Sequence, residues 1–266
     1  MKHHMGLLGG VAAGSIVLIL ASATARADNY VYGASSGISQ VPTTTPPTSG
    51  NYLILTTAGG TEFAPMASYP TALGANGDSG WFSSGAESGP GNDAYITGNV
   101  SSVNGGHLRS FLGFNTTGLL AGVTSAALVV NTYQVVTTGT ENVDFLGGIN
   151  LVNGGTAATS ETAANYVLST EQNVSPAPSD ITNIYTALGN GPIYGTFGYT
   201  AADDNAYETI PLTPSFISDI NSALGNGQGL FVIGEDDTTV PEPASLSILM
   251  LGGTALLGRR RRSQLI

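Results

Sequence analysis

Cysteine is absent from the 266 residues of this chain, and histidine occurs only three times. Without cysteine there is no disulfide framework and no thiolate metal site, so the fold depends on burial alone. Two of the histidines, His3 and His4, stand at the N-terminus, which leaves His107 as the only one in the body of the chain. The common zinc sites, which need several His or Cys ligands, are therefore excluded.

Basic residues are also scarce. Between residues 28 and 240 Arg109 is the only one, and it stands against seventeen acidic residues, a formal charge of −16 for this interval. Nucleic acid is excluded as a partner, because its binding depends on Lys and Arg that neutralise phosphates. We expect the side chain of Arg109 to pair with a nearby acid on the face of a strand.

Motifs for catalysis are missing too. No Gly-x-Ser-x-Gly elbow surrounds a serine near His107, and we interpret this histidine as a residue at which a strand begins. We therefore predict that the protein is not an enzyme. A polysaccharide hydrolase that uses two opposed carboxylates remains a less favoured alternative.

The first 27 residues have the pattern of an export signal. A polar start precedes an apolar stretch over residues 7–23, and Ala25 and Ala27 form a small-x-small cleavage site before Asp28. We expect the export machinery to remove this segment, so that the mature chain begins at Asp28. A retained N-terminal membrane anchor is the alternative.

The body of the chain has the texture of an all-β protein, with short β-branched or aromatic runs separated by Gly, Asn, Asp and Ser. This predicts a single antiparallel, jelly-roll-like β-sandwich over residues 51–237. The Pro-rich residues 28–50 are predicted to be an irregular lead-in with one short edge strand near Tyr30–Tyr32. The expected strands of the sandwich are 52–57, 94–100, 108–114, 126–136, 143–152, 194–200, 207–212 and 230–233.

One or two short helices are expected in the connections between strands. The frame Ile-x-x-Ala-Leu-Gly-Asn-Gly occurs at 184–191 and again at 220–227. Each copy predicts the end of a helix at a glycine that can take the left-handed C′ conformation. Before the second copy, we predict Thr213 as the N-cap and Pro214 at the first helical position.

The Gly-rich residues 73–93 predict a long loop that holds the only tryptophan, Trp81, next to Phe82. Long loops in compact domains are often functional, and an aromatic ring can stack on a sugar, so Trp81 and Phe82 are candidate ligand contacts. The alternative is that Trp81 only anchors the loop on the sandwich.

Two acidic clusters, within 203–208 and at 235–237, are the candidates for a metal site. Their carboxylates are hard oxygen ligands that suit Ca²⁺. Neither cluster has the spacing of a calcium-binding loop, so we predict solvated turns at both and no cofactor, with Ca²⁺ as the alternative.

The C-terminal residues 240–262 combine three features in a fixed order. A helix over the apolar residues 244–258 would be about 22 Å long, which is short for a hydrocarbon core of about 30 Å. The basic cluster behind it would hold that end on the cytoplasmic side. The parts are Pro241, Glu242 and Pro243, then the apolar segment, then Arg259, Arg260, Arg261 and Arg262.

This tail resembles the PEP-CTERM sorting signal of exported bacterial proteins. The resemblance implies that the tail holds the protein transiently in the inner membrane while an exosortase-type transpeptidase cleaves near Pro-Glu-Pro. It also implies delivery to the cell surface or the exterior of a Gram-negative bacterium that makes extracellular polysaccharide. A permanent single-pass anchor is the alternative.

The body of the chain also resembles β-sandwich domains of PEP-CTERM proteins. Residues 108–128 are similar to their recurrent Arg-x-Phe-x-x-Phe-Asp-Leu-Ser-Gly-Leu segment, with Asn115 in place of the usual Asp. Asn at this position preserves the capping of a turn but weakens metal binding. The resemblance implies a non-enzymatic structural or adhesive role in an exopolysaccharide or biofilm matrix. A secreted carbohydrate-binding module is the alternative.

Overall fold

The computed structural model describes residues 28–34, 41–67, 79–89, 92, 94–103, 106–147, 149, 160–173 and 175–239. The predicted export signal (1–27) and sorting signal (240–262), including its membrane segment 244–258, lie outside these residues. Within the described part, no helix is long and apolar enough to cross a membrane. The strands are β1 (Asn29–Ala34), β2 (Tyr52–Thr57), β3 (Gly60–Pro65), β4 (Ser79–Phe82), β5 (Ala94–Asn99), β6 (His107–Asn115), β7 (Val123–Val136), β8 (Glu141–Leu146), β9 (Ile193–Tyr199), β10 (Tyr207–Pro211) and β11 (Leu230–Asp237), and the helices are α1 (Ser160–Glu171), α2 (Pro178–Leu188), the 3₁₀ turn η2 (Ala201–Asp203) and α3 (Pro214–Gly225).

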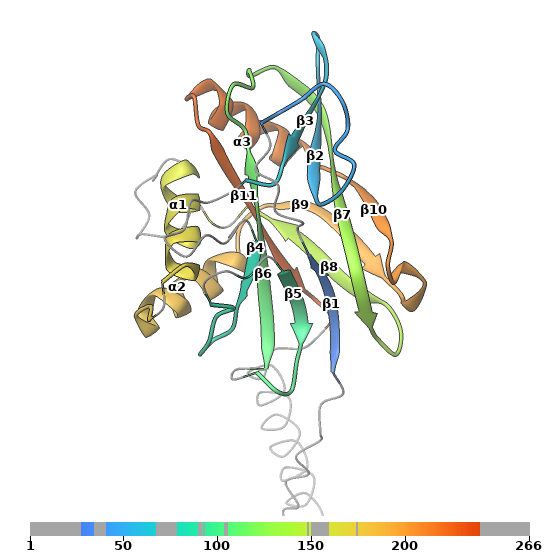
Figure 1. The fold of residues 1–266 in the computed structure, drawn as a ribbon, viewed down its shortest axis with the longest axis vertical. Helices are drawn as coiled ribbons and strands as arrows, with labels where there is room; N and C mark the ends of the chain where they lie inside the picture. Colours follow the sequence, from blue (N-terminus) through green and yellow to red (C-terminus); the bar gives the residue numbers. More distant parts are fainter. Residues whose placement is uncertain are drawn as a thin grey trace, which may run out of the picture.

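The strands form one antiparallel sheet, which confirms the predicted all-β class (Figure 1). Its order is β3-β2-β7-β1-β5-β6-β11-β8-β9, while β10 pairs with β7 and β4 pairs with β6. The sheet curls until β9 and β10 come together, where Thr213 N donates a hydrogen bond to Tyr194 O just beyond β10, at 2.7 Å. Its concave face therefore encloses a core.

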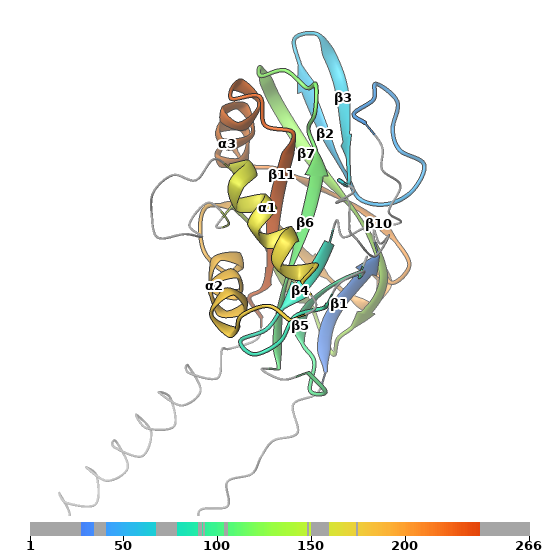
Figure 2. The ribbon, with the colours of Figure 1, turned by 60° about the vertical axis from the view of Figure 1, so that its left-hand side comes forward.

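Side chains alternate between the two faces of the sheet, as in any strand. On β11, Phe231 and Ile233 enter the inner core, whereas Val232 enters a second core between the convex face and the helices α1 and α2. Figure 2 shows these two helices packed side by side against this face, with α3 near one end of the sheet. We call the concave side the inner face and the helix-covered side the outer face.

β1 is a central strand, so its prediction as an edge strand was wrong. It pairs with both β5 and β7, and Val31 is only 1% exposed. A close approach makes this possible, because a Cβ on Gly33 would lie 2.3 Å from both the Tyr95 ring and Asn131 O. The prolines that suggested an edge follow β1 in the sequence and take no part in it.

Two strands were not predicted, and several strand boundaries differ from the predictions. The predicted loop around Trp81 contains β4, which is paired with β6. The hairpin partner of β2, which is β3, was not predicted; a turn at Ala58 and Gly59 connects the two strands, and Gly60, which begins β3, has a φ of +129°. β8 ends at Leu146 instead of residue 152, and a Cβ on the following Gly147 would lie 2.3 Å from the Tyr194 ring. β11 continues to Asp237 instead of ending at residue 233.

The described residues contain three α-helices, one more than predicted, since α1 was missed. α3 begins as expected, with Thr213 as N-cap and Pro214 at the first position, although the Thr213 hydroxyl donates to Ile193 O and not to the helix. α3 ends before Gly227, whose φ of +69° confirms the left-handed glycine. The corresponding glycine of the first copy, Gly191, also has a positive φ, of +104°, but α2 already ends at Leu188, with Gly189 as its C-cap at a φ of −95°.

Candidate functional site

The acidic run at the end of β11 is buried, so its prediction as a solvated turn was wrong. Glu235, Asp236 and Asp237 are 1%, 8% and 2% exposed, because β11 continues through them between β6 and β8. Alternation along the strand puts Glu235 and Asp237 on the inner face and Asp236 on the outer face. The three neighbouring carboxyls therefore have separate environments.

On the outer face, Asp236 is held by both basic side chains of β6. Its Oδ1 lies 2.8 Å from His107 Nε2, and its Oδ2 lies 3.1 Å from Arg109 Nε. Arg109 Nη1 also donates to Tyr185 O at 3.1 Å, and its Cζ lies 4.4 Å from the centroid of the Tyr185 ring. These contacts confirm that His107 begins a strand and that Arg109 pairs with an acid on a strand face.

This outer network fixes α2 on the sheet. Burial alone would raise the pKa of Asp236, but the hydrogen bonds and charges of His107 and Arg109 outweigh it and lower the pKa. Gly189 makes room for the guanidinium, because a Cβ there would lie 2.1 Å from Arg109 Cζ. Both carboxylate oxygens of Asp236 are thus engaged in holding the fold.

On the inner face, Glu235 is buried without a basic partner among the described residues. Ser110 Oγ donates to its Oε2, while its Oε1 has no hydrogen-bond partner in the described part of the chain. Burial raises the pKa of Glu235 to about 7, despite the hydrogen bond from Ser110. Burial, with Glu235 nearby, also raises the pKa of Tyr95 and of Tyr199. Protonation of Glu235 thus neutralises a negative charge that would otherwise be buried.

Asp237 meets a second buried carboxyl, Glu141, which is 3% exposed. Thr239 lies between them: its Oγ1 is 2.8 Å from Glu141 Oε2 and also contacts Asp237 Oδ1. Burial is the main cause that raises the pKa of Asp237 to about 6. Sequence analysis missed this pair because 96 positions separate its members and the predicted strand began only at residue 143, after Glu141.

The two candidate ligand contacts, Trp81 and Phe82, differ in their burial. Phe82 is fully buried, with its ring centroid 6.0 Å from that of Phe111 in the outer core, so its prediction as a ligand contact was wrong. Trp81 is half-buried and lies on the same face as Ser110, its partner on β6. Its backbone N–H donates to Ser88 Oγ at 3.2 Å, and its half-buried side chain stays a candidate contact.

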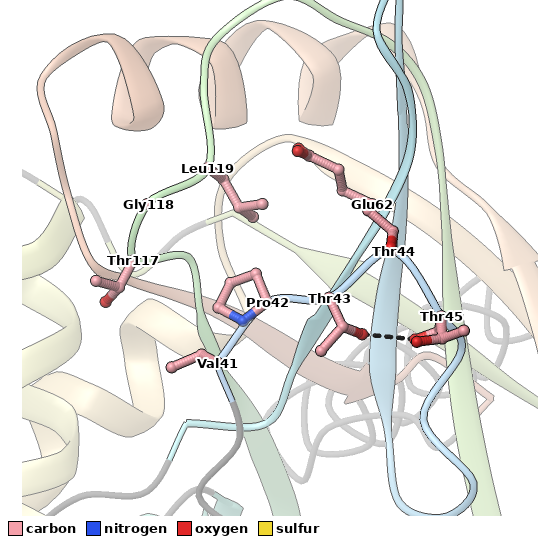
Figure 3. A pocket seen from close by; sticks show the side chains of 9 residues that line it. All are labelled: Val41, Pro42, Thr43, Thr44, Thr45, Glu62, Thr117, Gly118 and Leu119. Carbon is pink, nitrogen blue, oxygen red and sulfur yellow. Dashed lines mark hydrogen bonds between the residues drawn. The ribbon is translucent and has the colours of Figure 1, made fainter.

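A groove of about 520 Å³ lies beside the β2–β3 hairpin, remote in sequence from Trp81 (Figure 3). Threonine hydroxyls, one carboxylate and a few apolar groups line it, and Thr43 Oγ1 donates to Thr45 O at 2.5 Å. Such a lining offers donors and acceptors to a polar ligand. The lining residues are Val41, Pro42, Thr43, Thr44, Thr45, Glu62, Thr117, Gly118 and Leu119.

The other acidic cluster is a turn, as predicted. Thr200 and Asp203 form a capping box on η2, and Asn205 follows with a φ of +56°. In the described part of the chain, no three His, Asp or Glu side chains are grouped so that they could hold a metal ion. Asn115 Oδ1 accepts a hydrogen bond from Thr117 N at 2.9 Å, which is the turn-capping role expected of it.

At the predicted start of the mature chain, Asp28 is exposed and its Oδ1 accepts a hydrogen bond from Ser101 N at 2.7 Å. The cleavage-site residues Ala25 and Ala27 and the sorting residues from Pro241 to Arg262 lie outside the described residues. Comparison with protein-family models, with curated proteins and with solved structures found no match.

Proposed function

We propose that this chain is an exported, non-enzymatic protein of the bacterial cell surface or extracellular matrix, sorted and cleaved at its C-terminal Pro-Glu-Pro signal. The observation that carries the proposal is the order of sequence features. A predicted export signal ends at Ala27, and Pro241–Pro243, an apolar segment and Arg259–Arg262 close the chain. The export machinery and an exosortase-type transpeptidase are the partners that this order implies.

The placement of the domain's ends supports the proposal. Asn29 pairs with Asn99, Asn99 pairs with His107, and Asp236 pairs with the nearby Arg109, so β1 starts and β11 ends at the same end of the sheet. The tip of the β2–β3 hairpin lies at the opposite end (Figure 1). A domain held at a membrane through its C-terminal tail would thus present the hairpin and its groove outward.

Charge also favours a role outside the cell. Arg109, the only basic residue between 28 and 240, is 8% exposed, so the surface of the described domain has acidic but no Lys or Arg side chains. Such a surface keeps a protein soluble among other anionic polymers. In this proposal the curled sheet is a jelly-roll-like β-sandwich that serves as a structural or adhesive unit in an exopolysaccharide matrix.

The mass of the protein in the surface and culture fractions of its host tests the proposal. We expect a product that begins at Asp28 and lacks Arg259–Arg262. A variant in which Glu242 is changed to Ala should keep its tail and stay in the inner-membrane fraction, while Glu62→Ala, in the groove, should be processed normally. A wild-type chain that keeps its tail in the inner membrane would contradict the proposal.

A secreted carbohydrate-binding module is the second candidate, favoured by the half-buried Trp81 and by the groove with its threonine hydroxyls. Aromatic stacking and hydroxyl-to-hydroxyl hydrogen bonds are the contacts that sugars make. Saturable binding on a glycan panel that Trp81→Ala or Glu62→Ala abolishes would establish it. Binding that both variants retain would exclude the surface around Trp81 and the groove as the glycan-binding site.

A further inference from the structure

Thr239 is the last residue that the structure describes, and in the sequence it stands two positions before Pro241. Thr238 N donates to Asn142 O at 2.9 Å, and Thr239 N donates to Asp237 Oδ1 at 2.9 Å. The Thr239 hydroxyl lies between Glu141 on β8 and Asp237 on β11. We call Glu141, Asp237 and Thr239 the carboxyl clasp.

The hydrogen atoms in the clasp can be counted. A threonine hydroxyl has one proton and two acceptor lone pairs. Asn142 N donates to Thr239 Oγ1 at 3.1 Å, which uses one lone pair. The single hydroxyl proton can reach Glu141 or Asp237, but not both. The second contact is therefore a hydrogen bond only when a carboxyl group supplies its own proton.

The surroundings favour that extra proton, because no Lys or Arg side chain of the described residues faces the clasp. His107 and Arg109 bind Asp236 on the other face of the sheet. Burial, and more weakly the neighbouring Glu141, raises the pKa of Asp237 to about 6, although hydrogen bonds from Thr239 lower it. The titratable groups on the neighbouring elements are Glu235 on β11, Tyr199 opposite Glu141 on β9, and the tyrosines Tyr30 and Tyr32 on β1 and Tyr95 on β5.

We propose that the carboxyl clasp is a proton-dependent latch on the junction between the domain and the C-terminal tail. With one proton shared by Glu141 and Asp237, every bond to Thr239 is made and the junction stays docked on β8. Without it, two buried like charges face each other and Thr239 detaches. The chain before Pro241 is then free to enter a processing enzyme; this last step rests on the proposed function, whereas the latch does not.

Hydrogen exchange of the Thr238 and Thr239 amides in the full-length protein tests the latch. Protection factors, corrected for the intrinsic rate, should fall by about tenfold from pH 5 to pH 8, because one hydrogen bond lost with the shared proton weakens docking by roughly that factor. The amide of Val232, in the middle of β11, serves as the internal reference. Equal protection at both pH values would overturn the proposal.

Two variants sharpen the test. Glu141→Gln mimics the protonated clasp, because its amide can donate to Thr239 Oγ1 while its carbonyl still accepts from Thr137 Oγ1, which now lies 2.5 Å from Glu141 Oε1. Its protection should fall less from pH 5 to pH 8 than that of the wild type, because the repulsion between two carboxylates is gone while the burial of Asp237 remains. Thr239→Val should lose protection at both. A Glu141→Gln protein whose protection falls with pH as in the wild type would also overturn the latch.

The latch and the proposed function can fail separately. A pH-dependent junction on a chain whose tail is never removed in the host supports the latch and refutes sorting. Removal of the tail from a chain whose junction shows no pH dependence supports sorting and refutes the latch.

Discussion

Replacing Glu235 with Gln should remove a large part of the pH dependence of stability. In the folded protein burial raises the pKa of Glu235 to about 7, from an ordinary value of 4.5. A raised pKa means that the folded state binds the proton more tightly than the unfolded state. The stability from Glu235 is therefore fully present below pH 4.5 and is lost as the pH rises through 7. A shift of this size corresponds to about 3 kcal/mol.

Urea unfolding at pH 5 and at pH 8 measures the effect. Between these values the wild type should lose about 2 to 3 kcal/mol that the Glu235→Gln protein does not lose. Comparing each protein with itself cancels the cost of fitting the amide beside Ser110, and the other titrating groups are common to both. Glu62→Gln, in the open groove, is the control and should follow the wild type. If Glu235→Gln loses as much stability as the wild type, Glu235 is not an isolated buried carboxyl.

Three further substitutions, two of them paired with a comparison variant, test the outer face and β4 by thermal or urea unfolding. Gly189→Ala should destabilise the protein by about 1–3 kcal/mol, because the new Cβ would overlap the Arg109 guanidinium. Gly225 stands at the same place in the second copy of the repeated frame, and a Cβ there would have nothing within 4 Å. Gly225→Ala should therefore be neutral or slightly stabilising. Arg109→Met should cost about 3–5 kcal/mol, since it removes the cation from a buried carboxylate. Phe82→Ala should lower the free energy of unfolding by about 3–5 kcal/mol, because Phe82 is fully buried, and Trp81→Ala should lower it much less. Equal losses would contradict the different burial of the two side chains.

Much of the strand order along the chain was readable from the sequence. β2 and β10 were predicted almost to the residue, because β-branched and apolar residues fill them between turn residues. α1 was missed because only Val167 and Leu168 are large apolar residues in its buried stripe, which is otherwise made of alanine and polar residues. β4 was missed because its pairing with β6 outweighs the weak strand preference of Ser79 and Gly80.

The buried carboxyls could not be predicted from local pattern. An acidic run after the apolar residues 230–233 reads as the place where a strand ends, and only partners far along the chain keep it inside. Ser110 is 125 positions from Glu235, and His107 is 129 positions from Asp236. The scarcity of basic residues gave the one usable signal, because the single Arg109 of an acidic domain was expected to form an ion pair with an acid.

The three carboxyls of β11 respond to pH in opposite directions, and together they place the optimum of stability on the acid side of neutrality. The pKa of Asp236 is lowered by His107 and Arg109, so its contribution is lost as the pH falls through the folded value. The pKa values of Glu235 and Asp237 are raised, to about 7 and about 6, so their contributions are lost as the pH rises. The melting temperature should therefore be highest near pH 5 and decline toward pH 8. A maximum at pH 7 or above would mean that buried negative charge on the inner face costs the fold little.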